Sequence, residues 1–193
     1  MLSALGVSTS DALAKKAMER GADGPRILCV RYLLAVPVLL PFLSMGIPSL
    51  DRTFWLLHPV WIPLETVALY LYIRAIRVSP LSLTLPLLAL TPVFLVFTGW
   101  LFLGETVGLR GVAGIVLVAA GSYVINVGHG GRDVLGPFKA IVREKGTRLM
   151  VVVAFVYSLT SVLGKVLIQH SSPTYFAFHY AVVMSIVLAP AGL

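Results

Sequence analysis

Five of the ionisable side chains inside long apolar stretches are candidates for a function, because charged groups are otherwise rare in such stretches. They are Asp11, Lys15, Glu65, Lys165 and His179. At membrane depth such groups are costly, usually face a cavity or a partner, and mark solute or proton pathways. We therefore take these five residues as candidates for a substrate or proton pathway.

The five candidates differ in the chemistry that they could supply. Glu65 could bind a proton or a cationic substrate group, or it could pair with a Lys or Arg for packing alone. Asp11 and Lys15 are spaced i and i+4, so they can pair with each other. In the corresponding stretch around Lys165, Ser161 stands where Asp11 stands in the first copy. Lys165 therefore lacks this local acidic partner and is a better candidate than Lys15 for contact with an anionic group. His179 can change protonation near neutral pH, or it can be a hydrogen-bonded packing residue.

Motifs of enzymatic chemistry are not found in this sequence. There is no nucleophile, base and orienter set, no Gly-rich phosphate loop and no HExxH motif. Cys29 is the only cysteine, which excludes an intramolecular disulfide and a Cys-based metal site. We expect a protein that is not an enzyme and that uses no cofactor or metal.

The composition is that of a polytopic membrane protein. Hydrophobic residues make up 58%, charged residues 12%, and the mean hydropathy is +0.94. The net charge of +7 does not indicate nucleic acid as a partner, because the basic residues lie in short gaps between apolar runs. The expected surroundings are a lipid bilayer.

Gaps between charged residues predict about seven transmembrane helices in an all-α chain, since about 20 apolar residues span the hydrocarbon core. The first, 1–18, is interpreted as the latter part of a helix whose beginning is missing. The others are 32–50, 52–74, 78–104, 111–128, 149–168 and 173–193. Tight turns join them, apart from a longer basic loop at 129–148.

The basic residues predict the orientation in the plasma (inner) membrane. All of the 15 Lys and Arg residues except Arg52, Arg110 and Lys165 lie on the side that holds the 129–148 loop. By the positive-inside rule this side is cytoplasmic, which leaves the amino terminus outside.

Proline and glycine interrupt two of the predicted spans. Pro80, Pro86 and Pro92 recur every six residues, which indicates either a kinked packing helix or a cavity lining. Small residues on one helix face allow close approach of a neighbouring helix, so we expect a packing role for Gly114, Gly121 and Gly128.

A weak internal repeat relates the two ends of the chain. Ser8 and Lys15 correspond to Ser158 and Lys165, Pro25 corresponds to Pro173, and Arg31-Tyr32 corresponds to His179-Tyr180. The pattern predicts an inverted-repeat transporter. Its parts are a first five-helix repeat at 1–128, the connecting loop at 129–148, and the first two helices of a second repeat at 149–193.

From Ala68 onward the sequence resembles the end of a domain of the EamA family, in the drug/metabolite transporter superfamily. The residues that carry the resemblance are Ala75-Ile76, Ser79-Pro80, Leu90-Thr91-Pro92-Val93-Phe94, Phe102-Leu103-Gly104-Glu105, and Gly111 with the glycine-rich stretch through Gly121. It covers 25–127 well, the opening segment partly, and 149–193 as the start of a second domain. It implies ten helices in two inverted repeats that move small organic solutes by alternating access.

The chain departs from this pattern in lacking the last three helices of the second repeat. It also departs in orientation, because relatives are drawn with a cytoplasmic amino terminus. The first hypothesis is a permease or exporter of small organic metabolites, driven by a gradient because no nucleotide-binding motif is present. The alternative is a truncated or split non-transporting subunit that needs a complementing polypeptide or forms a homodimer.

Overall fold

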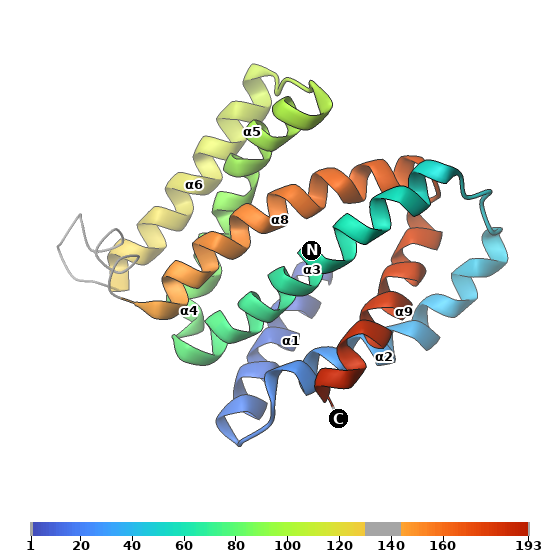
Figure 1. Ribbon diagram of the computed structural model, residues 1–193. Coiled ribbons are helices and arrows are strands. Elements are labelled where there is room, and N and C mark those ends of the chain that lie inside the picture. Colours follow the sequence, from blue (N-terminus) through green and yellow to red (C-terminus); the bar gives the residue numbers. More distant parts are fainter. Residues whose placement is uncertain (1, 130–143, 193) are drawn as a thin grey trace. The chain divides into compact units, whose positions relative to one another are not determined.

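The computed structural model describes residues 2–129 and 144–192, and all regular structure in these residues is helical. Most of the predicted 129–148 loop lies outside the described residues. The helices follow one another as shown in Figure 1: α1 Leu2–Glu19, α2 Gly24–Leu39, η1 Leu40–Met45, α3 Arg52–Val78, α4 Leu81–Thr84, η2 Leu85–Leu90, α5 Thr91–Leu103, α6 Leu109–His129, α8 Lys145–Gln169 and α9 Pro173–Gly192.

Five segments of the described chain are long and apolar enough to cross a membrane. They are Gly24–Ser44, Arg52–Val78, Leu81–Leu103, Lys145–Gln169 and Pro173–Pro190. The expectation of an all-helical, multi-pass membrane protein is confirmed at this level. Two further predicted spans fall on α1 and on α6, whose apolar part, Leu109–Val124, is shorter. The count of seven spans and the repeat boundaries therefore stay predictions.

The second helix begins well before the predicted start of its span. The charge-gap argument placed the span at 32–50, but α2 begins at Gly24 and contains Arg26 and Arg31. Pro25 explains the earlier start, because proline is favoured in the first helical turn, where its missing N–H would be unpaired anyway. Arg31 is tolerated inside the helix because it pairs with a carboxylate, as described below.

Proline also divides the span from Leu81 to Leu103 into α4, η2 and α5. Pro86 lies in the first turn of η2 and Pro92 in the first turn of α5. Each proline lacks an N–H and would clash with the preceding turn, so the α-helical hydrogen bonds are interrupted at these positions. Gly104 ends α5 in the left-handed region, with φ of +65°, a conformation that glycine adopts without strain.

The chain forms two compact units. Unit 1 contains 1–73 and 164–193, and unit 2 contains 74–163. In unit 1, α2 packs along α9, and Figure 1 shows the two helices side by side. They are antiparallel, because Cys29 bonds the Ser185 carbonyl while the later Tyr32 contacts the earlier Tyr180.

The core of unit 1 lies where α3 meets α9. Phe54 and Trp61 of α3 are among its fully buried side chains, and Trp61 packs against the rings of Phe176 and Tyr180 of α9. Burial of such large rings is the main stabilising contribution at this contact. The aromatic packing also brings polar atoms of both helices to the same interior.

Candidate functional site

Glu65 lies in unit 1 in a short chain of hydrogen bonds with two tyrosines. Its side chain is 7% exposed, and the hydroxyl of Tyr180 in α9 donates to Oε1 at 2.8 Å. The hydroxyl of Tyr32 in α2 lies 2.8 Å from that of Tyr180, and their rings meet edge to face. Three different helices therefore contribute one residue each to a chain of hydrogen bonds that ends at a buried carboxyl group.

The direction of these bonds depends on the charge of Glu65. A carboxylate can only accept, so Tyr180 donates its single proton to Glu65, and Tyr32 must then donate to Tyr180. When Glu65 is protonated it can donate instead, and both tyrosine hydroxyls can turn around. The chain thus has two hydrogen-bonded arrangements that differ by one proton on Glu65.

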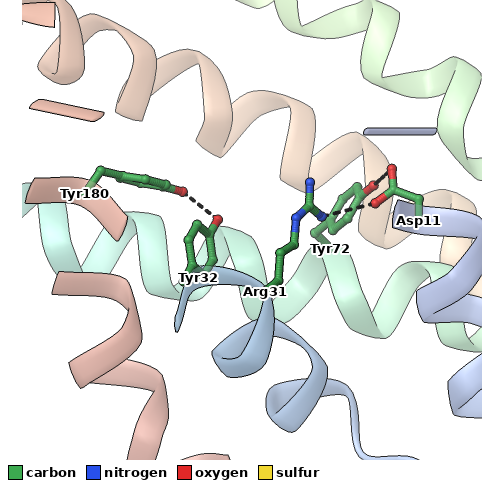
Figure 2. Close-up of polar contacts among 5 residues, drawn as sticks. All are labelled: Asp11, Arg31, Tyr32, Tyr72 and Tyr180. Atoms are coloured by element: carbon green, nitrogen blue, oxygen red, sulfur yellow. Dashed lines mark hydrogen bonds and ion pairs between the residues drawn. The ribbon is translucent and has the colours of Figure 1, made fainter. Parts of the chain in front are cut away.

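Asp11 is the centre of a second cluster in the same unit (Figure 2). Tyr72 of α3 donates to Oδ2 at 2.6 Å, and Arg31 of α2 donates to Oδ1 at 3.3 Å. Asp11 is 3% exposed and Tyr72 is 6% exposed, whereas 34% of the Arg31 side chain remains accessible. A buried carboxylate is stabilised when a cation and a hydroxyl group both bond it, as they do here.

The third polar contact joins two histidines. Nε2 of His58 in α3 lies 2.7 Å from Nε2 of His179 in α9, and Nδ1 of His58 lies 2.6 Å from the carbonyl oxygen of Phe54. His58 is buried and His179 is half-buried. Aromatic rings surround the pair, with Tyr175 stacked on His179 at a centroid distance of 5.8 Å.

The structure brings only some of the predicted site residues together. Glu65 and His179 both lie at the contact between α3 and α9, through Tyr180 and His58 respectively. Asp11 lies in its own cluster, with bonds from residues distant in sequence. Lys15 is half-buried one helical turn from Asp11, and Lys165 is exposed on α8. The roles proposed for these residues stay predictions.

Sequence reasoning missed His58, Tyr72 and both tyrosines that join Glu65. His58 and Glu65 are seven residues apart, which places both on one face of α3, and this spacing could have indicated His58. Tyr32 and Tyr180 occupy corresponding positions in the internal repeat, so that pattern contained a signal for them. Nothing in the local sequence indicated that Tyr72 would reach Asp11.

Asp51 and His170 form a contact outside the membrane-spanning segments, at the start of α3. Asp51 caps α3, because its Oδ1 accepts the N–H of Phe54 at 2.9 Å, and its Oδ2 lies 2.6 Å from Nδ1 of His170. The N–H of Phe54 is the main cause that holds the pKa of the Asp51 carboxyl below its usual value. The cap is therefore formed by the ionised carboxylate.

Unit 2 holds the prolines and glycines that were predicted to pack helices. The carbonyl of Pro86 accepts a hydrogen bond from the Ser122 hydroxyl, which joins η2 to α6. At Gly114 and Gly121 an added Cβ would have no atom within 4 Å, so in the described chain this face of α6 is open. The side-chain position of Gly128 lies outside the described part, and the packing role of this face stays a prediction.

A cavity of about 580 Å³ in unit 2 has none of the residues of these polar clusters in its lining. Its lining comes from α5 and α6 and is hydrocarbon apart from one phenol: Val93, Val96, Val112, Ile115, Val116, Ala119, Ala120 and Tyr123. Within the described residues, no group of three His, Cys, Asp or Glu side chains is placed to hold a metal ion. The polar groups of unit 1 described above can bind protons and exchange hydrogen bonds.

Comparison with known proteins identifies one family. The model of the EamA-like transporter family matches residues 1–127, the greater part of the chain. No curated protein and no solved structure matches the chain.

Proposed function

The chain belongs to the EamA-like transporter family, and we propose that it moves small organic metabolites across the plasma membrane by alternating access, driven by a gradient of protons or of the solute. Members of this family are transporters and not enzymes. The five long apolar helices are consistent with a multi-pass membrane protein. Beyond membership of the family, we propose the class of solute, the energy source and the residues involved.

The observation that carries the proposal is the burial of Glu65 inside a membrane-spanning helix, bonded by a tyrosine of another helix. Glu65 is 7% exposed, and the hydroxyl of Tyr180 donates to it at 2.8 Å. Ionisable groups at membrane depth are costly, and those that are found there usually mark solute or proton pathways. Tyrosine hydroxyls can either donate or accept, which suits such exchange.

The second buried carboxylate supports the same proposal. Asp11 also lies in unit 1 and is bonded by a tyrosine, Tyr72, in addition to Arg31. Arg31 remains partly accessible, so its guanidinium could also meet an anionic solute group. We propose that Glu65 binds the proton or a cationic group, and that Asp11 holds Arg31 in position.

The test is flux through the purified chain in lipid vesicles. The probes are a set of small zwitterionic, cationic and anionic amines and acids of metabolic size, each added outside vesicles that contain a pH-sensitive dye. At least one class should enter faster than into empty vesicles. Glu65→Gln should lower that flux by about tenfold to a hundredfold. Gln can still accept the hydrogen bond from Tyr180, but it can neither ionise nor release a proton, and the loss of a charged hydrogen-bonding group corresponds to about 1.5–3 kcal/mol.

The control for this substitution is Glu19→Gln, which makes the same chemical change at an exposed position at the end of α1. The control should retain the flux of the unchanged chain. If no probe enters faster than into empty vesicles, the transport proposal fails for this chain by itself. If Glu65→Gln and Glu19→Gln give equal flux, Glu65 has no part in the mechanism.

A further inference from the structure

The two imidazoles between α3 and α9 have a hydrogen-bond pattern that determines their tautomers. Nδ1 of His58 lies 2.6 Å from the Phe54 carbonyl oxygen, which can only accept, so this nitrogen carries a proton. In neutral His58 the other nitrogen, Nε2, is then an acceptor. The donor in the 2.7 Å contact between the two Nε2 atoms must therefore be His179.

This assignment leaves one position in the pair that can take up a first proton without breaking a bond. Because Nε2–H of His179 donates to His58, the one ring nitrogen of the two histidines that still has an unused lone pair is Nδ1 of His179. A proton from water that binds there makes His179 an imidazolium, and its Nε2–H then donates to a neutral acceptor. A charged donor strengthens the bond between the two rings.

A second proton cannot bind without breaking the contact. It would have to bind Nε2 of His58, where the lone pair already accepts the hydrogen bond from His179. Two N–H groups would then face each other at 2.7 Å, on two cations whose ring centroids are 4.8 Å apart. Like charges at this separation repel strongly in a surrounding of low dielectric constant.

In the described part of the chain, aromatic rings pack against both imidazoles. The rings that pack against the pair are Phe54, Trp55 and Trp61 from α3 and Tyr175 from α9, of which only the last can titrate. Next along α9 is Tyr180, which bonds Glu65 of α3 and Tyr32 of α2. Ionisable side chains on the neighbouring helices include Cys29 and Arg31 on α2, Lys165 on α8, and Asp51 with His170 at the start of α3 and the end of α8. The described part of η1, which packs against α9, has no ionisable side chain.

A proton fits this site better than a metal ion does. Two imidazole nitrogens that share a tetrahedral zinc ion at about 2.0–2.1 Å would lie more than 3 Å apart. The observed 2.7 Å is the length of a hydrogen bond, and the described residues offer no third ligand.

We propose that His58 and His179 form a proton-binding site that holds α3 to α9 while it carries no proton or one proton, and that releases this contact when it binds a second. The site is distinct from Glu65 and does not depend on what the chain transports. Acidification that loads the pair twice therefore weakens the packing between α3 and α9.

The direct test is nuclear magnetic resonance of the full chain in lipid nanodiscs with ¹⁵N-labelled histidine. At neutral pH, a nitrogen–nitrogen coupling across the hydrogen bond should join Nε2 of His58 to Nε2 of His179. On acidification, Nδ1 of His179 should gain its proton first with the coupling retained, and the coupling should disappear in a later step. Absence of the coupling at every pH, or its loss on the first protonation, would overturn the proposal.

Thermal unfolding against pH gives the second measurement. His58→Gln and His179→Gln keep hydrogen-bonding groups at the contact but remove the titration of the pair. His170→Gln is the control that removes a histidine outside the pair, and all four chains carry Asp51→Asn so that the contact between Asp51 and His170 adds no pH dependence of its own. The Asp51→Asn chain and its His170→Gln variant should lose Tm as the pH falls, and the two pair variants should lose less. An equal fall of Tm in all four chains would contradict the proposal, and the resonance measurement on the unchanged chain decides the matter if a variant does not fold.

Discussion

The bond between Tyr72 and Asp11 offers the sharpest test of the polar clusters in unit 1. Its length of 2.6 Å and the burial of both side chains, at 6% and 3% exposure, describe a short bond to a carboxylate that excludes water. Tyr72→Phe removes only the donating hydroxyl. The expected effect is a loss of stability, because the buried carboxylate loses a partner that water does not replace.

The magnitude follows from two ranges that overlap. Hydrogen bonds to charged groups contribute about 1.5–3 kcal/mol, whereas hydrogen bonds between helices in membranes average about 0.6 kcal/mol and reach about 1.7 kcal/mol. Asp11 also accepts a bond from Arg31 at 3.3 Å, which limits the effect of losing one partner. We expect Tyr72→Phe to lower the free energy of unfolding by about 1.5 kcal/mol.

The assay is equilibrium unfolding by denaturing detergent in mixed micelles, followed by tryptophan fluorescence. Trp61 is buried in α3, the same helix as Tyr72, so its emission reports the loss of packing there. Tyr70→Phe is the matched control, since Tyr70 is 49% exposed on that helix, and its effect should stay within about 0.5 kcal/mol.

A double-mutant cycle identifies the partner. If Tyr72 stabilises through Asp11, the effect of Tyr72→Phe should shrink in an Asp11→Ala background, with a coupling energy above about 0.5 kcal/mol. Effects of the two substitutions that simply add would refute the reasoning, because Tyr72 and Asp11 would then stabilise the chain independently.

Two further predictions concern a glycine contact and a helix cap. Gly146→Ala should destabilise unit 2 by about 1–3 kcal/mol, because the new Cβ would lie 2.6 Å from the Ala75 carbonyl oxygen. Gly121→Ala should be neutral or stabilising, because there is open space around Gly121. Unfolding of both variants in denaturing detergent checks this. The folded-state pKa of Asp51 is lowered, chiefly by the Phe54 N–H, so the stability that this group adds is complete above its unfolded pKa and is lost as the pH falls through the folded one. Asp51→Asn should therefore reduce the acid-dependent fall of Tm below about pH 4.

Each of these two predictions has an outcome that would count against it. Equal stability of Gly146→Ala and Gly121→Ala would mean that α8 and the end of α3 do not approach as closely as the structure shows. If Tm falls as much at low pH in Asp51→Asn as in the unchanged chain, the ionised carboxylate of Asp51 does not stabilise the protein by capping α3.

Local sequence properties predicted much of the helical framework. Apolar stretches with at most one Asp, Glu, Lys, Arg or His located the spans around 78–104, 149–168 and 173–193, because apolar segments of this length are stable in the hydrocarbon core of a membrane. Pro86 and Pro92 marked the breaks between α4, η2 and α5, since the missing N–H acts on the proline's own turn. The start of α2 was wrong because Arg31 was treated as a boundary, when a partner distant in sequence holds it inside the helix.

The motifs between Ala68 and Gly121 already indicated the family that the match over residues 1–127 shows, because such motifs depend on residue types in order along the chain. The composition alone indicated the membrane class. Only the tertiary structure decided which polar groups meet. The i, i+4 spacing predicts that Lys15 can pair with Asp11 within one helix. The hydrogen bonds that Asp11 accepts from Arg31 and Tyr72 come from two other helices. Glu65 likewise meets Tyr180 of α9. A buried charge must find a partner somewhere, and the packing of helices determines which distant residue supplies it.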